Sequence, residues 1–379
     1  MKVALIHDVM AVYGGAERVL EELHLLFPDA PVYTSIFRAE SFPPHIRAWD
    51  VRTSPMDRIP WGERLHRALF MLYPFAMNSF DLDEYDLVIS SSYNFAHHVA
   101  VRPGARHICY CHSPARFLWD SHAYARRERL GRLPAALQKT SLPMLRALDR
   151  SAAQGVDAFV STSRLVRARV QRCYGRPSEI VPPPIDLDAF HIAERLPDEP
   201  YYLMLMRLVG WKRPEIVVDA CGELGLPLVV AGTGRSHEAL ARRAGPSVCF
   251  VGEVGGERKA RLLAECQALI LPSEEDFGIT PLEAMASGRP VIAFRGGGAL
   301  DTVIEGATGV LFDEQTPECL AETLRGFDAA AYDPARLRAH AQRFDRPHFQ
   351  RRMTRLIEEV LRAPGQEPAS EPSLLVSNM

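Results

Sequence analysis

The chain has 379 residues, of which 47% are hydrophobic, and this length predicts two domains of ordinary size instead of one core. It contains no run of about 18 apolar residues, so the sequence excludes a membrane-spanning helix. The formal net charge of −3 is close to neutral, and we do not expect a nucleic-acid partner.

The charge is unevenly divided between the two parts of the chain. Residues 1–185 carry 23 basic and 18 acidic side chains, whereas the remainder carries 21 and 29, which gives +5 and −8. A basic N-terminal part could face an anionic surface or acceptor, although uneven solvated faces explain the same counts equally well.

Cysteine usage and the first residues indicate a cytoplasmic protein. The seven cysteines are scattered without a C-x-x-C pair, so we expect reduced thiols. The chain enters a strand-like run at 3–6 without a charged leader or cleavage site, which predicts that no signal peptide is present.

Apolar runs rich in Val, Ile and Leu recur along the chain with helical stretches between them. They are nearly continuous in hydrophobicity, as expected of parallel strands that are buried on both faces. They lie at 3–6, 86–91, 106–111, 157–161, 202–206, 226–231, 248–252, 269–272, 290–294 and 309–312. The sequence therefore predicts an α/β fold with two doubly wound parallel sheets.

Three consecutive prolines at 182–184 mark the predicted joint, because they suit neither a helix nor a central strand. We expect an N-terminal domain over 1–185 and a C-terminal domain over 198–345. A last helix at 346–362 is expected to cross back to the first domain, and the tail 363–379 is expected to be disordered.

Gly14 and Gly15 follow the first strand and open an amphipathic helix. Backbone N–H groups at such a helix N-terminus suit an anion, and glycine permits close approach. The pair does not make a dinucleotide fingerprint, and a plain loop breaker explains it equally well.

His112 ends the strand at 106–111 and is expected to be a hydrogen-bonding group at the interdomain cleft. Cys109 and Cys111 beside it raise the alternative of a metal site. We disfavour that alternative because successive strand residues alternate between faces.

Arg207 and Lys212 follow the first strand of the second domain, where open α/β sheets bind their ligands. Two converging cations suit a diphosphate. The chain has 40 arginines and only four lysines, so a lysine here hints that a compact ammonium is required. Exposed surface cations are the alternative.

The segment 274–283 places carboxylates at Glu275 and Glu283 around a Phe-Gly turn. Thr280, Pro281 and Glu283 match a capping box, with Thr280 as the N-cap. Capping explains Glu283 without any function, but it explains neither Glu275 nor the turn.

This segment resembles the Glu-x7-Glu signature of the retaining glycosyltransferases of family 4, which have the GT-B fold of two Rossmann-like domains facing across a cleft. Six stretches occur in that family's order and spacing, and together they extend along most of the chain. They are Gly14-Gly15-Ala16-Glu17, His112-Ser113-Pro114, Arg207 with Lys212, Ala231-Gly232-Thr233-Gly234, the segment 274–283, and Ala286-Ser287-Gly288-Arg289-Pro290-Val291.

The resemblance implies a role for each of the cations. Arg207 and Lys212 would hold the donor's diphosphate, and Gly15 would supply N–H groups from the other domain. His112 would lie beside the donor sugar. Enzymes of this kind usually need no metal, because positive side chains and helix N-termini stabilise the leaving nucleotide.

For the acidic segment, the resemblance implies contacts with the sugar and the ribose. Glu275 would face the donor hexose, and Glu283 would reach the ribose hydroxyls. The N–H groups of Phe277, Gly278 and Ile279 would help to bind sugar or phosphate.

The stretch 109–120, together with Ile6-His7-Asp8 and 13–18, is similar to bacterial enzymes that build O-antigen or exopolysaccharide. Several of these use GDP-mannose and extend a saccharide carried on a polyprenyl diphosphate. The expected function is therefore transfer of a hexose, mannose by preference. The alternatives are a sugar-nucleotide epimerase on the same scaffold and a non-catalytic partner in polysaccharide assembly.

Two regions bear on a lipid-carried acceptor and on peripheral contact with the inner face of the plasma membrane. The stretch 64–75 mixes basic and large apolar residues, and Arg126, Arg127, Arg129, Arg132 and Lys139 crowd a second region. Both could touch anionic lipid. A packed helix with a basic outer face is the alternative.

Overall fold

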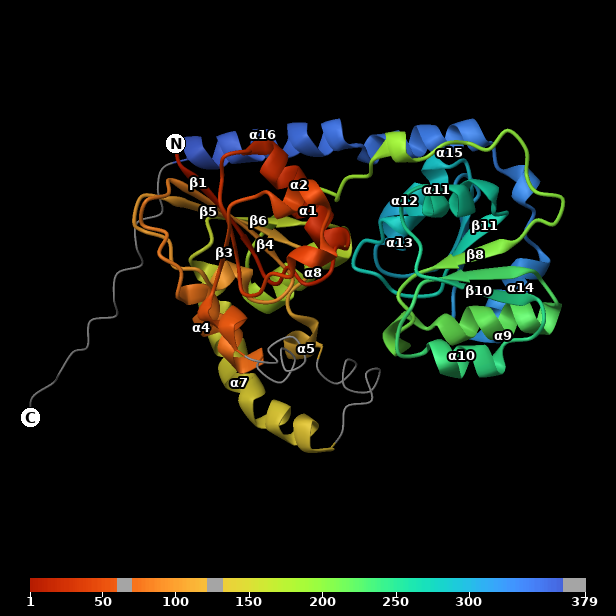
Figure 1. The fold of residues 1–379 in the computed structure, drawn as a ribbon, viewed down its shortest axis with the longest axis horizontal. Coiled ribbons are helices and arrows are strands. Elements are labelled where there is room, and N and C mark those ends of the chain that lie inside the picture. Colours follow the sequence, from red (N-terminus) through yellow and green to blue (C-terminus); the bar gives the residue numbers. More distant parts are fainter. Residues whose placement is uncertain (60–69, 121–131, 364–379) are drawn as a thin grey trace, which may run out of the picture.

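The computed structural model of the chain describes residues 1–59, 70–120 and 132–363, and it contains two parallel sheets, each with helices on both faces (Figure 1). The first sheet has seven strands in the order β3-β2-β1-β4-β5-β6-β7, and the second has six in the order β10-β9-β8-β11-β12-β13. This architecture confirms the predicted fold class.

The strands of the first sheet are β1 (Val3–His7), β2 (Val32–Thr34), β3 (Val51–Thr53), β4 (Leu87–Ser92), β5 (Arg106–Cys111), β6 (Ala158–Ser161) and β7 (Ser178–Ile180). Those of the second are β8 (Tyr202–Leu205), β9 (Leu228–Ala231), β10 (Val248–Gly252), β11 (Ala268–Leu271), β12 (Val291–Phe294) and β13 (Gly309–Phe312).

The helices of the first domain are α1 (Gly15–Leu26), α2 (Pro44–Arg47), α4 (Tyr73–Asn78), α5 (Arg116–Trp119), α7 (Arg132–Gln154) and α8 (Arg164–Tyr174), with 3-10 helices η1 (Ala39–Ser41), η2 (Pro55–Arg58), η3 (Phe70–Leu72) and η4 (Ala96–His98). The 3-10 helix η5 (Leu187–Ala189) follows and packs against the second domain. The later helices are α9 (Pro214–Leu224), α10 (His237–Arg243), α11 (Gly256–Glu265), α12 (Thr280–Ala286), α13 (Ala299–Thr302), α14 (Pro317–Arg325), α15 (Pro334–Ala341) and α16 (Arg346–Arg362), with η6 (Gly210–Lys212), η7 (Ala329–Ala331) and η8 (Gln342–Phe344).

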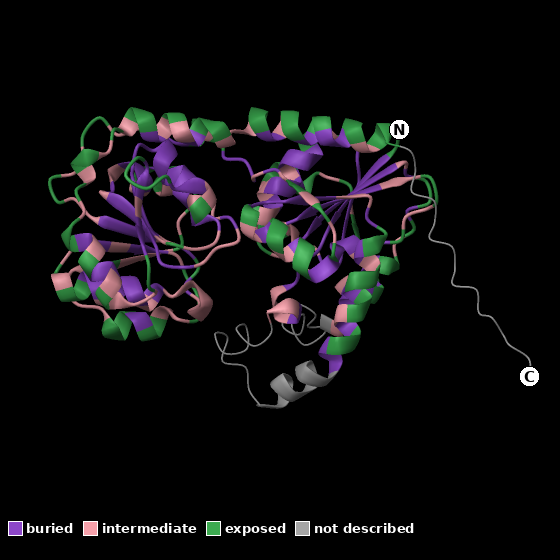
Figure 2. Cartoon of the chain, turned by 180° about the vertical axis from the view of Figure 1, so that it is seen from behind, coloured by how far each residue is buried: buried purple, intermediate pink, exposed green. Residues whose placement is uncertain are grey.

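Each sheet lies between two helical layers, which explains the continuous apolar runs of its strands. On β1, Leu5 belongs to the core cluster beneath α1 and α16, whereas Ala4 and Ile6 belong to the cluster beneath α4 and α7. Successive residues of a strand point to opposite faces, so a strand that is covered on both faces is largely apolar on both. The buried strands run through the middle of each domain, behind exposed helix faces (Figure 2).

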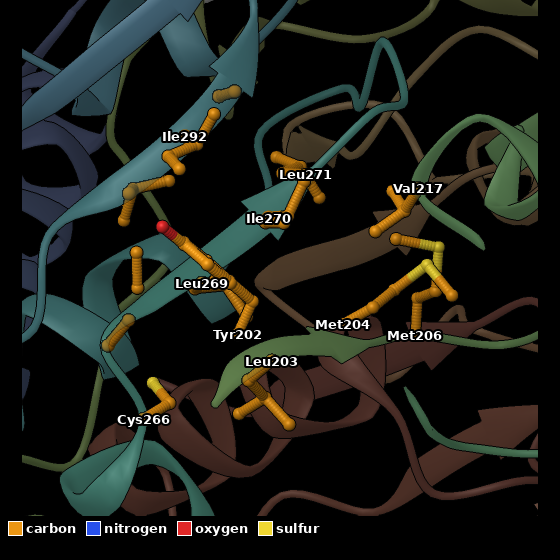
Figure 3. Close-up of a cluster of buried hydrophobic side chains, with 14 of the residues drawn as sticks. Tyr202, Leu203, Met204, Met206, Val217, Cys266, Leu269, Ile270, Leu271 and Ile292 are labelled. Atoms are coloured by element: carbon orange, nitrogen blue, oxygen red, sulfur yellow. The ribbon is translucent and has the colours of Figure 1, made fainter. Parts of the chain in front are cut away.

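The second domain has one continuous core around β8 and β11. Leu203 and Met204 of β8 and Leu269 and Ile270 of β11 are at most 1% exposed, and Figure 3 shows these side chains projecting from the two adjacent strands. This packing fixes the strand ends that carry the candidate site.

The chain passes between the domains twice, and the two passages lie side by side. The N–H of Ile185 donates to the carbonyl oxygen of Phe344 at 2.9 Å. Beyond that point α16 returns to the first domain, where Phe349, Met353 and Leu356 join its core. The domains are therefore held by two adjacent connections and by side chains at their boundary.

Three sequence predictions fall wholly or partly outside the described residues. These are the tail beyond 363, the basic and apolar stretch up to 69, and the arginine cluster up to 131. Within the described parts of the chain, no helix is both long and apolar enough to cross a membrane.

Candidate active site

The strand order of each sheet reverses between two neighbouring strands, and the predicted site residues follow those strands. The reversal lies between β1 and β4 in the first sheet and between β8 and β11 in the second. Arg207 follows β8 and Glu275 follows β11, while His112 follows β5, next to β4. Ligands of open α/β sheets bind at such reversals, outside the carboxyl ends of the strands.

Lys212 and Glu275 form an ion pair at the reversal of the second sheet. Lys212 Nζ lies 3.0 Å from Glu275 Oε1, and both side chains are less than 16% exposed. Ser273 Oγ donates to the same oxygen at 2.8 Å. Burial would raise the pKa of Glu275, but the Lys212 charge and these hydrogen bonds hold that pKa below its usual value. Glu275 is therefore an ionised, fixed carboxylate at neutral pH.

Arg207 is exposed just after β8, and it makes no ion pair with any residue that the structure describes. Two glycines hold its loop: a Cβ at Gly232 would lie 1.9 Å from the carbonyl oxygen of Met206, and one at Gly234 would lie 2.3 Å from that of Leu208. Only glycine permits this approach, so the Ala231–Gly234 stretch positions Arg207.

Glu283 contradicts the predicted capping box. The N-cap of α12 is Ile279 with no side-chain cap, and Thr280 is the first helical residue. The Glu283 carboxylate, 1% exposed, instead pairs with Arg18 Nη1 at 2.8 Å and Lys259 Nζ at 2.5 Å. Two cations therefore offset the cost of burying this carboxylate, and a helix cap is not required to explain it.

These cations also set the protonation state of Glu283. Burial would raise its pKa, but Lys259 and Arg18 together hold that pKa below the usual range. Burial in turn lowers the pKa of Lys259, which Glu283 only partly offsets. Since Glu283 already has two partners, a ribose could bind it only through the lone pairs that remain or by displacing Arg18.

The turn Phe277–Ile279 brings the second domain against the first. Gly278 has φ of 83°, which favours glycine, and Phe277 is buried. Across the boundary, a Cβ at Gly15 would lie 3.3 Å from Ile279 Cδ1. The start of α1 and the acidic segment are therefore in direct proximity.

His112 is partly exposed at the end of β5, and its Nε2 lies 2.8 Å from Ser91 Oγ. Burial, with a smaller contribution from the nearby His7, lowers the pKa of His112 to about 3. The ring is therefore neutral at physiological pH. Cys109 and Cys111 lie in a separate apolar cluster, so the three side chains do not converge on one point.

Asp276 connects the domains through residues that the sequence did not single out. Its carboxylate accepts from Arg116 Nη2 at 2.5 Å and also from Arg169 Nη1. Its carbonyl oxygen accepts from Ser163 Oγ at 2.6 Å. The guanidinium of Arg116 also lies over the ring of Trp211, with 5.0 Å to its centroid. The start of α5 therefore touches two loops of the second domain, the one that carries Trp211 and the one that carries Asp276.

Arg18 and Lys259 are further residues that sequence reasoning missed. Arg18 lies in the stretch 13–18 beside the Gly-Gly pair, where no local pattern predicts its contact with Glu283. Lys259 is one of four lysines, so the scarcity argument that singled out Lys212 applied to it equally.

His97, His98 and Asp149 are the group of possible metal ligands found among the described residues. Asp149 Oδ1 lies 3.2 Å from His97 Nε2 and 2.9 Å from His98 Nε2, and Trp119 Nε1 donates to the other oxygen. These hydrogen bonds explain the buried carboxylate as a structural link between η4, α5 and α7.

Two family models match the chain in succession. Residues 13–189 match "Glycosyltransferase Family 4", and residues 188–342 match "Glycosyl transferases group 1". The chain belongs to glycosyltransferase family 4. The predicted family is confirmed, and both matched regions contribute residues to the site described above.

The curated relatives of this family-4 chain include several mannosyltransferases. A GDP-mannose-dependent alpha-(1-6)-phosphatidylinositol monomannoside mannosyltransferase of Mycolicibacterium smegmatis is 31% identical over 202 residues, 45% of this chain and 53% of the relative. A D-inositol 3-phosphate glycosyltransferase of a Nocardioides species is 32% identical over 182 residues, 39% and 40% of the two chains. The alpha-1,3/1,6-mannosyltransferase ALG2 of Dictyostelium discoideum is 52% identical over 65 residues, 17% and 16%. The chain spans about half or less of the length of these relatives.

Solved structures share the fold over nearly the whole chain. The Anabaena protein HepE, solved with UDP and glucose, gives a TM-score of 0.71 at 19% identity and covers 95% of this chain and 100% of its own. Sucrose-phosphate synthase of Thermosynechococcus elongatus gives 0.72 at 21% identity, with 94% and 99% covered. At these identities the likeness shows the GT-B fold alone.

Proposed function

We propose that this family-4 protein transfers a hexose from a nucleotide sugar to a saccharide acceptor with retention of configuration. The observation that carries the proposal is the Lys212–Glu275 pair, with Arg207 exposed after β8 at the reversal of the second sheet. A cation, a fixed carboxylate and a second cation at that point suit a sugar diphosphate.

In this proposal Lys212 and Arg207 take the diphosphate and stabilise the negative charge that develops on the leaving nucleotide. Glu275 stays ionised because Lys212 and Ser273 hold it, so it can orient the hexose and stabilise positive charge at the anomeric carbon. The leaving group and the acceptor hydroxyl then share one face of the sugar, and the departing phosphate oxygen can accept the hydroxyl proton. His112, neutral and partly exposed, would lie beside the hexose from the first domain.

For the donor we propose GDP-mannose. Two of the relatives described above are mannosyltransferases, and the name of one specifies GDP-mannose. The acceptor that we propose is a saccharide on a lipid diphosphate, reached at the inner face of the plasma membrane. The excess of basic residues in 1–185 supports an anionic acceptor or surface. Sedimentation with anionic vesicles at low salt tests the membrane contact, and a protein that stays in the supernatant would contradict it.

The first test is thermal stabilisation by GDP, UDP and ADP, each with and without Lys212→Ala. A ligand at a hundred times its Kd adds about 2.7 kcal/mol, which corresponds to about 5–10 °C for a domain of this size. The matched control is Lys2→Ala, which removes a lysine–glutamate pair of 2.7 Å at the opposite end of the first sheet. We expect the control to leave the stabilisation unchanged.

Each outcome of the nucleotide test supports a different function. Stabilisation by GDP alone, lost in Lys212→Ala, would support a GDP-sugar donor. Stabilisation by UDP would keep the transferase and refute the choice of GDP-mannose. No response to any nucleotide would refute the proposal and favour a non-catalytic partner in polysaccharide assembly. An altered sugar nucleotide formed without acceptor would instead identify an epimerase.

A further inference from the structure

A chain of buried hydrogen bonds lies behind His112. Ser91, at the end of β4, lies 2.8 Å from His112 Nε2 and 3.1 Å from His7 Nδ1. The other nitrogen of His7, Nε2, lies 3.3 Å from Glu17 Oε1. Glu17, His7 and Ser91 are at most 7% exposed. This series of hydrogen bonds therefore runs from α1 through β1 and β4 to the partly exposed His112.

The chemistry of the four groups gives this chain a direction. An ionised carboxylate only accepts hydrogen bonds, so His7 Nε2 must donate to Glu17. When His7 is uncharged, its Nδ1 is then an acceptor, which Ser91 satisfies with its single hydroxyl proton; a doubly protonated His7 would reverse the direction, which the spectra described below would reveal. The Ser91 oxygen is left to accept, so His112 Nε2 must carry the ring proton of His112.

The position of Glu17 supports this assignment. Its second oxygen accepts from the N–H of Gly14 at 2.9 Å, and Glu17 is the N3 residue of α1. Both oxygens are therefore occupied by donors, and the carboxylate is fixed at the start of the same helix that carries Gly15. The low pKa of His112 is consistent with a neutral ring that has one N–H.

We propose that Glu17 and His7 are positioning residues that hold His112 in the Nε2–H tautomer, so that its Nδ1 presents a lone pair to a hydroxyl of the donor sugar. The structure gives Nδ1 no partner among the residues that it describes. This inference rests on the proposed function for the identity of the hydroxyl, but the tautomer itself does not depend on any substrate. His112 would thus select a donor that offers a hydroxyl proton at that place.

The test is the tautomer of His112, read from long-range ¹H–¹⁵N spectra of the full chain labelled with ¹⁵N-histidine. We expect a protonated Nε2 and an unprotonated Nδ1 at neutral pH. A protonated Nδ1 would overturn the proposal, because the chain would then run in the opposite direction.

The same strand supplies a matched control variant. Ser90 precedes Ser91 on β4, is equally buried, and bonds His107 Nε2 at 2.8 Å. Ser91→Ala removes the contacts to His112 and His7, whereas Ser90→Ala removes one buried serine–histidine contact that is not connected to His112. We expect the signals of His112 to show both tautomers in Ser91→Ala and to keep one in Ser90→Ala.

Turnover gives the second readout, as release of nucleotide from GDP-mannose and from UDP-glucose. Ser91→Ala should lower kcat about five- to tenfold, the loss of one neutral hydrogen bond in the transition state, with the Kd of the nucleotide within twofold. Glu17→Gln leaves one side-chain oxygen to accept from two donors, so its kcat should lie between that of Ser91→Ala and that of the unaltered protein. Equal losses in Ser91→Ala and Ser90→Ala would overturn the positioning role. If the unaltered protein released nucleotide from neither donor, the proposed function would be refuted. The tautomer spectrum would still test the inference about Glu17, His7 and His112.

Discussion

The three-charge cluster of Glu283, Lys259 and Arg18 makes a quantitative prediction about stability. Lys259 is 15% exposed and Arg18 is 41% exposed, while their shared carboxylate is 1% exposed. Removing one partner of a buried pair costs about 3–5 kcal/mol. We take about 3 kcal/mol for Lys259→Met, because Arg18 still contacts Glu283. A half-exposed cation contributes less, so Arg18→Met should cost about 1 kcal/mol.

The assay is differential scanning calorimetry, which can resolve the transitions of two domains. For a domain of about 150 residues, about 2–4 °C of Tm corresponds to 1 kcal/mol. Lys259→Met should therefore lower the Tm of the second domain by about 6–12 °C, and Arg18→Met by about 2–4 °C. Lys2→Met, which breaks an exposed pair, should change Tm by less than about 2 °C.

A double variant tests whether the loss of stability comes from the unpaired Glu283 charge. Lys259→Met with Glu283→Gln removes both charges while nearly preserving volume, so it should recover most of the loss caused by Lys259→Met alone. Equal shifts for Lys259→Met and Arg18→Met would refute the ranking by burial. An additive double variant would show that the charges are not coupled, which would refute the reasoning itself.

Three other predictions concern the site, the pH response and the domain boundary. Lys212→Ala should abolish nucleotide binding, whereas Glu275→Ala should lower kcat about 100-fold and leave the nucleotide Kd within threefold; the reverse pattern in calorimetric titration and turnover would contradict these roles. Burial, with a contribution from the charge of His97, lowers the pKa of His107 to about 3, so the folded state binds fewer protons than the unfolded state between pH 3 and about 6.5. The stabilisation from neutral His107 is present above that window and is lost as pH falls. Between pH 7 and 5, the unfolding free energy of the unaltered protein should therefore fall by about 2 kcal/mol more than that of His107→Gln. Denaturant titrations that gave parallel pH curves for the two proteins would contradict this. Asp276→Asn should weaken the contacts to Arg116 and Arg169, so it should raise the radius of gyration in small-angle scattering and change Tm by less than about 2 °C. The control Asp313→Asn removes an exposed pair within the second domain and should leave the radius of gyration unchanged.

The long strands could be predicted from the sequence because both of their faces are buried. Their apolar runs stand out from the helices, as the runs that became β1, β5 and β12 show. β2, β3 and β7 were not predicted, and each has three residues. A strand of that length carries no measurable periodicity, and β3 and β7 lie at the edges of the sheet, where an apolar run is not required.

The site could be predicted where one residue follows a strand end, but not where two distant elements meet. Arg207, Lys212 and Glu275 each lie after a recognisable strand. The partners of Glu283 come from α1 and α11, and no local pattern joins them to 274–283. The capping box was wrong for the same reason. Three residue types specify a local motif, but the partners of the Glu283 carboxylate are two cations that the tertiary fold brings to it.

The acidic segment therefore does more than bind a ligand. Glu275 pairs within its own domain, Asp276 pairs with two arginines of the first domain, and Glu283 pairs with one cation from each domain. A ligand that contacts Glu283 competes with, or adds to, an ion pair that also holds the domains together. A donor that displaced Arg18 from Glu283 would free that guanidinium at the start of α1, next to Gly15, where a diphosphate would attract it. Donor binding and the contact between domains are in this way coupled through Glu283, so a substitution of Glu283 should change both together.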